Sequence, residues 1–107
     1  MQLTKDYKET ISERAQRDNK FAMALLDEAM TLFLNGEADI ARLILRDLVN
    51  ATVGFKVLAD ETTKSSKSLL RMLSAKGNPT MDNLTTIFKV LCQKLNVNIE
   101  VHVVHCQ

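Results

Sequence analysis

The sequence has few of the residues that build cross-linked or membrane-embedded proteins. Its 107 residues include only two cysteines, Cys92 and Cys106, and these show no paired CxxC spacing. A disulfide framework is therefore not expected, and both thiols should be free in a reducing compartment. No apolar run approaches the roughly 18 residues that a membrane span needs. The first residues carry neither an apolar segment nor a small-residue cleavage site, so we expect a cytoplasmic protein with no membrane partner.

Patterns that carry catalysis are also lacking. The sequence shows no nucleophile beside a base, no phosphate-binding loop and no paired metal-ligand spacing. Adjacent carboxylates such as Asp60-Glu61 splay apart on a helix and are typical of solvated surface. His102, His105 and Cys106 form an H-x-x-H-C pattern. On a strand, however, residues three apart point to opposite sides, which does not suit zinc. We expect no enzyme, no metal site and no cofactor.

What the chain does have is the composition of an ordinary globular protein, with 46% hydrophobic and 25% charged residues. The length fits one domain. We expect residues 1–35 to form a helical extension, residues 36–95 a core and residues 97–104 a strand. The expected class is all-α, with five to six helices and this one C-terminal β-strand.

Apolar residues recur at three- and four-residue spacing along most of the chain, which predicts helices. The segment after Gly36 is apolar on most sides, as in a central helix, and leaves a narrow polar stripe that contains Arg42 and Arg46. Ser65 and Thr80 are placed as N-caps. The predicted helices span residues 6–17, 19–35, 37–51, 55–61, 65–74 and 80–95.

After Asn96 the period changes from helical to alternating. The apolar members of the alternation are Val97, Ile99, Val101 and Val103. This pattern predicts a half-buried strand, and the chain offers no second strand to pair with it. Because a solitary strand leaves unpaired backbone groups, we expect these four residues to form a homodimer interface. The alternative is a frayed tail that becomes ordered only on a partner.

Residues 54–91 have the layout of a DNA-reading helix-turn-helix: three short helices, the middle one beginning with hydroxyls and lysines. Residues 54–79 hold five Lys/Arg and two Asp/Glu, a net charge of +3. The N-terminal half of the second motif helix enters the major groove, so Ser66, Lys67 and Arg71 are the predicted base-reading residues. Phosphate contacts are predicted for Lys64, Ser65, Ser68, Lys76 and Asn78.

Two readings of this basic segment are open. Short capped helices with Lys and Ser on their outer faces are common, and most are simply solvated surface. A helical module that caps a protein partner without sequence-specific DNA binding would have no reason to keep a basic recognition face. The face therefore favours operator DNA as the partner.

The same segments resemble a known family. NATVGFKVLADETTKSSKSLLRMLSAKGNPTMDNL (residues 50–84) and LTKDYKETISERAQRD (residues 3–18) are similar to the addiction module antidote proteins, HigA-like antitoxins of the helix-turn-helix transcriptional regulator superfamily. The most specific pieces are LxRMLSxxGNPT, from Leu69 to Thr80, and the entry Asn50-Ala51-Thr52-x-Gly54-Phe55. The resemblance as a whole covers almost the whole chain.

The resemblance implies a lambda-repressor-like fold and a dimeric bacterial antitoxin of the cytoplasm. Such a protein represses its own operon and neutralises a RelE/ParE-like toxin. Because residues 1–35 exceed what a minimal DNA-binding core needs and present polar faces, we expect the toxin to contact them. The resemblance places the recognition helix on residues 65–74. One position departs from the family: many relatives have Gly in the turn where this chain has Thr63. A β-branched residue disfavours positive φ, so remodelling is expected there.

Overall fold

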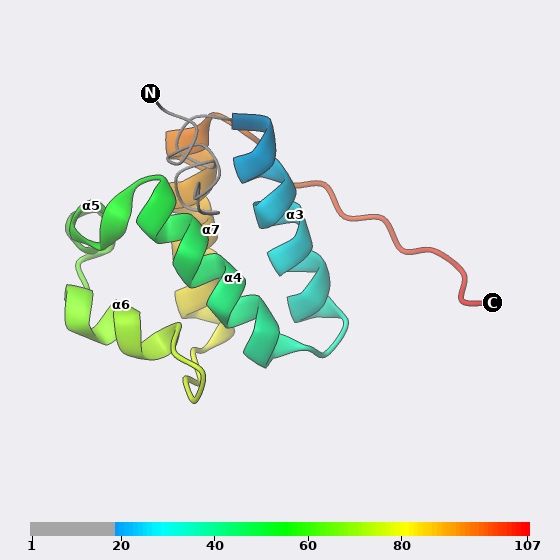
Figure 1. The fold of residues 1–107 in the computed structure, drawn as a ribbon, viewed down its shortest axis with the longest axis horizontal. Coiled ribbons are helices and arrows are strands. Elements are labelled where there is room, and N and C mark those ends of the chain that lie inside the picture. The colour runs from blue at the N-terminus through cyan, green and yellow to red at the C-terminus, as the bar shows by residue number, and fades with distance from the viewer. Residues whose placement is uncertain (1–18) are drawn as a thin grey trace, which may run out of the picture.

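The computed structural model describes residues 19–107, and this part of the chain contains five helices and no strand. The prediction of an all-α protein is confirmed for these residues. In Figure 1, α4 crosses the middle of the molecule with α7 behind it, α3 on one side, and α5 and α6 on the other. The helix predicted over residues 6–17 lies outside the described residues. The helices are α3 (Asn19–Leu34), α4 (Ala38–Ala51), α5 (Gly54–Thr62), α6 (Ser66–Met72) and α7 (Met81–Leu95).

Helix α3 belongs to the core although the sequence assigns it to an extension. It buries Ala22, Leu26 and Ala29, each 3% exposed or less, and packs mainly along α4. The helix ends at Leu34. Gly36 follows with a φ of +89°, which suits glycine, and the Glu37 N–H donates to the Leu32 carbonyl at 2.8 Å. The second half of the predicted extension, which forms α3, is therefore part of the core.

Helix α4 is central, as its pattern predicts. Its buried residues include Ala41, Leu45, Leu48 and Val49, none of which exposes measurable surface. One part of the prediction is wrong: Arg42, placed on the polar stripe by its spacing, is only 9% exposed. A buried guanidinium needs hydrogen-bond acceptors, and here they come from a loop distant in sequence.

Helix α7 lies behind α4 in Figure 1 and buries its apolar side in the core. Thr80 caps it by accepting a hydrogen bond from the Asn83 N–H at 3.1 Å, as predicted. Ile87 and Leu91 are fully buried. Near them, Phe33 of α3 meets Phe88 of α7 edge to face, with ring centroids 5.9 Å apart. Helix α3 thus contacts both α4 and α7, and α5 in turn packs on α4 and α7 and carries α6.

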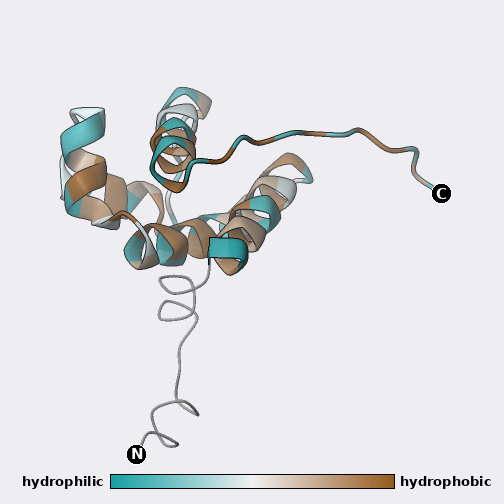
Figure 2. Cartoon of the chain, turned by 90° about the horizontal axis from the view of Figure 1, so that it is seen from above, coloured by the Kyte–Doolittle hydropathy of each residue, from teal (hydrophilic) through white to brown (hydrophobic). Residues whose placement is uncertain are grey.

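The strand predicted over residues 97–104 is absent. Residues 97–107 have no regular secondary structure, and the tail runs away from the helices (Figures 1 and 2). The physical reason is that a strand is defined by its pairing, and a single copy of the chain supplies no second strand. The predicted half-burial holds only at the start of the tail: Val97 and Ile99 are half-buried, while Val101 and Val103 are 57% and 96% exposed.

Candidate nucleic-acid interface

Helices α5 and α6 are joined by a turn of three residues, Thr63, Lys64 and Ser65. The buried side of α5 ends with Leu58 and Thr62, and the Thr62 hydroxyl donates to the Leu58 carbonyl at 2.7 Å. Thr63 follows in the left-handed region with φ of 59°. The remodelling expected from its β-branched side chain therefore does not occur, and the turn keeps positive φ at the cost of strain.

Helix α6 begins where the sequence predicts. Ser65 is its N-cap, and the Ser65 hydroxyl oxygen accepts a hydrogen bond from the Ser68 N–H at 3.0 Å. Leu69 is the fully buried residue of the helix and holds it against the core. The helix ends at Met72, two residues before the predicted end, because the chain turns there into the loop of residues 73–80.

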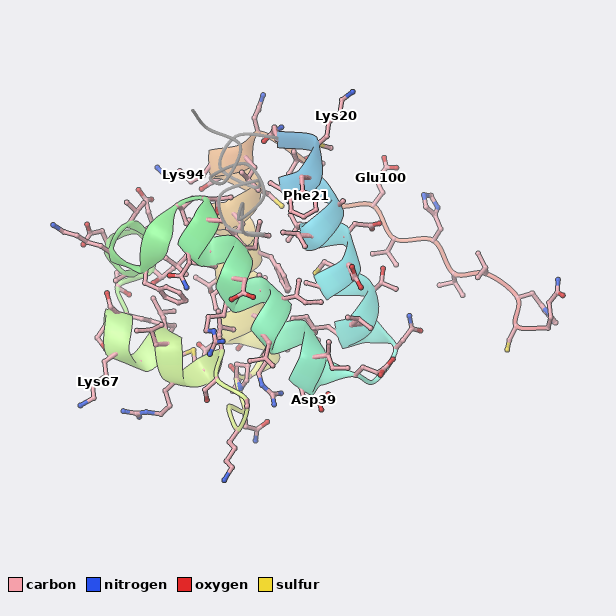
Figure 3. All side chains as sticks on the ribbon, viewed as in Figure 1. Lys20, Phe21, Asp39, Lys67, Lys94 and Glu100 are labelled. Carbon is pink, nitrogen blue, oxygen red and sulfur yellow. The ribbon has the colours of Figure 1, made fainter. Side chains whose placement is uncertain are left out.

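Two of the three predicted base-reading residues share the exposed face of α6. Lys67 and Arg71 are both exposed and are four residues apart, so their side chains lie one turn apart on the same face. Lys67 points away from the body of the molecule in Figure 3. Leu70, 43% exposed, lies between them in sequence and was not predicted. In the sequence, the signal for Leu70 is that it is apolar but does not belong to the positions predicted to face the core.

Ser66 is placed differently. Its side chain is half-buried, and its hydroxyl donates to the Phe55 carbonyl at 3.3 Å. This bond ties the start of α6 to the start of α5 across the turn. The structure therefore brings Ser66 to the contact between the two helices and leaves Lys67 and Arg71 on the outer face.

The residues predicted to meet phosphates flank this face on both sides. Lys64 and Ser68 are half-buried, and Ser65 is exposed at the start of α6. Lys76 and Asn78 are exposed in the loop that follows the helix. Around α6 the described side chains thus carry four cationic groups and several hydroxyls or amides, which is the chemistry that binds a phosphate backbone.

The loop after α6 is held by two contacts that the sequence did not reveal. The Arg42 guanidinium donates from Nε to the Ser74 carbonyl at 3.0 Å and from Nη2 to the Ala75 carbonyl at 2.8 Å. Gly77 lies so close to the end of α6 that a Cβ there would be 2.6 Å from the Arg71 carbonyl oxygen and would overlap that of Met72. Arg42 and Gly77 therefore fix the position of Lys76 relative to the exposed face.

Groups that would indicate other chemistry are few. Across residues 19–107 no three His, Cys, Asp or Glu side chains come together as a metal site. Burial raises the pKa of the Cys92 thiol, so this side chain is held in its neutral form. None of the helices described is long and apolar enough to cross a membrane.

Comparison with known proteins adds no assignment. No family model matches the chain, and no curated protein or solved structure matches it.

Proposed function

We propose that the protein is a DNA-binding transcriptional regulator that reads its operator with α6. In this proposal α5, the turn of residues 63–65 and α6 form a lambda-repressor-like helix-turn-helix. The observation that carries it is the pairing of Lys67 and Arg71 on one exposed face, beside a loop that presents Lys76. A helix with two long cations one turn apart and a cationic loop at its end fits a major groove bordered by phosphates.

Each side chain has a distinct expected role in such a complex. Arg71 can donate two hydrogen bonds to O6 and N7 of a guanine, the most common specific contact in the major groove. Lys67 reaches a guanine acceptor or a phosphate. Leu70, exposed between them, offers the apolar contact that a thymine methyl group takes. Lys64 and Lys76 lie at the two ends of the helix, where phosphates would pass.

The structure changes the expected part played by Ser66. Because its hydroxyl proton is used by the Phe55 carbonyl, we assign it to positioning α6 on α5. Base reading then rests on Lys67, Leu70 and Arg71. A substitution at Ser66 should weaken all DNA binding together, since it would alter how the helix is presented.

The regulatory context follows from the family resemblance of the sequence. We propose that the protein is a dimeric antitoxin of a type II toxin-antitoxin module in the bacterial cytoplasm, which represses its own operon and neutralises a RelE/ParE-like toxin. Two-fold symmetry would require a pseudo-palindromic operator with half-sites about one helical turn apart. The toxin contact is proposed for residues 1–35, of which α3 exposes polar residues such as Glu28. Co-purification with a small toxin encoded beside it would test this part.

The DNA proposal is tested by fluorescence anisotropy with a duplex from the upstream region of the gene and a scrambled duplex, each at two salt concentrations. We expect the upstream duplex to bind more tightly and Arg71→Ala to weaken that binding by about 1–3 kcal/mol. Lys89→Ala removes the same charge from the exposed surface of α7 and serves as the matched control. Equal, salt-sensitive binding of both duplexes, unaffected by Arg71→Ala, would instead favour a module that caps a protein partner.

A further inference from the structure

Within the described residues 19–107, the backbone of the C-terminal tail has no backbone hydrogen-bond partner after Val97. The last backbone hydrogen bond runs from the Val97 N–H to the Cys92 carbonyl at 3.0 Å. Residues 98–107 form none to the backbone of residues 19–107. An extended segment with a free row of donors and acceptors is a template for pairing with another strand.

The side chains of the tail are sorted onto two sides. Ile99, Val101 and Val103 alternate with polar residues, and exposure rises along the apolar side to 57% at Val101 and 96% at Val103. On the polar side, His102 Nε2 lies 3.7 Å from Glu100 Oε1. Figure 2 shows the same alternation of hydrophobic and hydrophilic residues along the tail. A segment sorted in this way is suited to one face of a sheet.

A groove of about 680 Å³ lies between the tail and α3. Met30 and Leu34 contribute the apolar part of its α3 wall, and Leu34 is 54% exposed. The tail wall contains residues from both of its sides, Glu100 and Val101 among them. An edge of the tail, with its backbone groups, therefore faces the groove, which is open to a strand that pairs along it.

The sequence of the tail selects both the partner and the register. Two copies related by a two-fold axis pair antiparallel, and one residue then lies opposite itself. If that residue is Glu100, two carboxylates face each other, which is unfavourable. If it is Val101, each Glu100 faces the His102 of the other copy and each Ile99 faces the Val103 of the other copy. Over residues 99–103 this register places each carboxylate opposite an imidazole and each apolar residue opposite another apolar residue.

We infer that the tails of two copies pair as antiparallel strands along this groove, with the two-fold axis at Val101 and Glu100 of each copy opposite His102 of the other. The inference rests on the dimer of the proposed function and gives it an interface and a register. The strand expected from the sequence then exists only in the dimer. The pairing also covers the exposed Val101 and Val103 and the open side of Leu34.

Disulfide cross-linking of the full chain tests the register. In a Cys106→Ser background, which retains the half-buried Cys92 as an internal control, Val101, Ile99 and Val103 are each replaced by cysteine. Val101→Cys places two thiols on directly opposed residues, whose Cα separation of about 4.5–5.5 Å suits a disulfide. Ile99→Cys or Val103→Cys alone places the thiols four residues apart, about 13 Å, which is too far. A mixture of differently tagged Ile99→Cys and Val103→Cys chains brings them opposite again.

Under mild oxidation we expect Val101→Cys and the mixture to form several-fold more covalent dimer than either single variant alone. Self-cross-linking of Val103→Cys in preference to Val101→Cys would overturn the register. A dimer in sedimentation that none of these cysteines cross-links, or a monomer, would overturn tail pairing itself. The background protein is also measured for preference between the upstream and scrambled duplexes. If the protein prefers the upstream duplex but its tails do not cross-link, only this inference is contradicted. If the tails cross-link but the protein shows no duplex preference, only the DNA-reading proposal is contradicted.

Discussion

The guanidinium of Arg42, in the middle of the helical frame, donates to the carbonyl of Ser74, 32 positions further along the chain, and a second bond reaches Ala75. The side chain is almost fully buried, and both acceptors belong to the loop that follows α6. The core helix α4 thereby sets where the basic loop beside the candidate DNA-binding face lies. The same side chain therefore ties the position of this loop to the packing of the core.

Arg42→Lys should destabilise the protein by about 1–3 kcal/mol, because a lysine cannot reproduce the two directed bonds of the guanidinium and at least one part-buried bond is lost. Urea denaturation followed by circular dichroism measures the change. Arg71→Lys makes the same chemical change on the exposed face of α6 and should alter the free energy of unfolding by less than about 0.5 kcal/mol. Equal losses in the two variants would show that the Arg42 bonds contribute no net stability.

Gly77→Ala should cost about 1–3 kcal/mol, since the new methyl group meets the carbonyl oxygens of Arg71 and Met72 and backbone must move. The neighbouring substitution Ala75→Ser lies on an exposed residue of the same loop and should be nearly neutral. Thermal unfolding of both variants distinguishes close backbone contact from general sensitivity of the loop. A Gly77→Ala protein as stable as the parent would mean that the loop does not pack on the end of α6 in this way.

Thr63→Gly should stabilise the protein by up to about 1 kcal/mol. The left-handed conformation at φ of 59° costs a β-branched residue more than the added backbone entropy costs glycine. Asn96 has nearly the same φ, 58°, and asparagine tolerates it, so Asn96→Gly should gain less. Melting temperatures of the two variants test this, and a larger gain at Asn96 would contradict strain at the turn.

Much of the fold could be predicted from the sequence because its determinants are local. Apolar spacing located α4 and α7, and the hydroxyls of Ser65 and Thr80 marked the helix starts where the caps are found. The N-cap and the exposed pair Lys67 and Arg71 then followed from helix geometry alone.

The features that the sequence did not reveal depend on distant partners. The burial of Arg42 requires carbonyl groups 32 positions away, which spacing along α4 cannot show. The inward orientation of Ser66 depends on Phe55 of the preceding helix. The alternation after Asn96 predicted the half-burial of Val97 and Ile99 but not the exposure of Val101 and Val103, and it predicted the wrong secondary structure, since a strand also needs a pairing partner.

The two cysteines should differ in reactivity. Burial raises the pKa of the Cys92 thiol above its ordinary value of 9.0, whereas Cys106 is exposed in the tail. At neutral pH a disulfide reagent should therefore modify Cys106 quickly and Cys92 slowly, and Cys106→Ser should remove the fast phase. The raised pKa of Cys92 contributes to the free energy of unfolding fully below pH 9.0. This contribution falls as the pH rises above 9.0, because the thiol of the unfolded chain ionises before the buried thiol does. A fast phase that survives in Cys106→Ser would contradict the burial of Cys92.

The most direct test of the central proposal, that α6 reads bases, is a panel of upstream duplexes that each carry one base-pair substitution. The wild-type protein should lose about 1–3 kcal/mol of binding at a few positions. Arg71→Ala should become indifferent at one of these positions in each half-site and keep its discrimination elsewhere, while Lys89→Ala keeps the whole profile. If Arg71→Ala and the wild-type protein discriminate identically at every base pair, Arg71 does not read DNA and the proposed role of α6 is wrong.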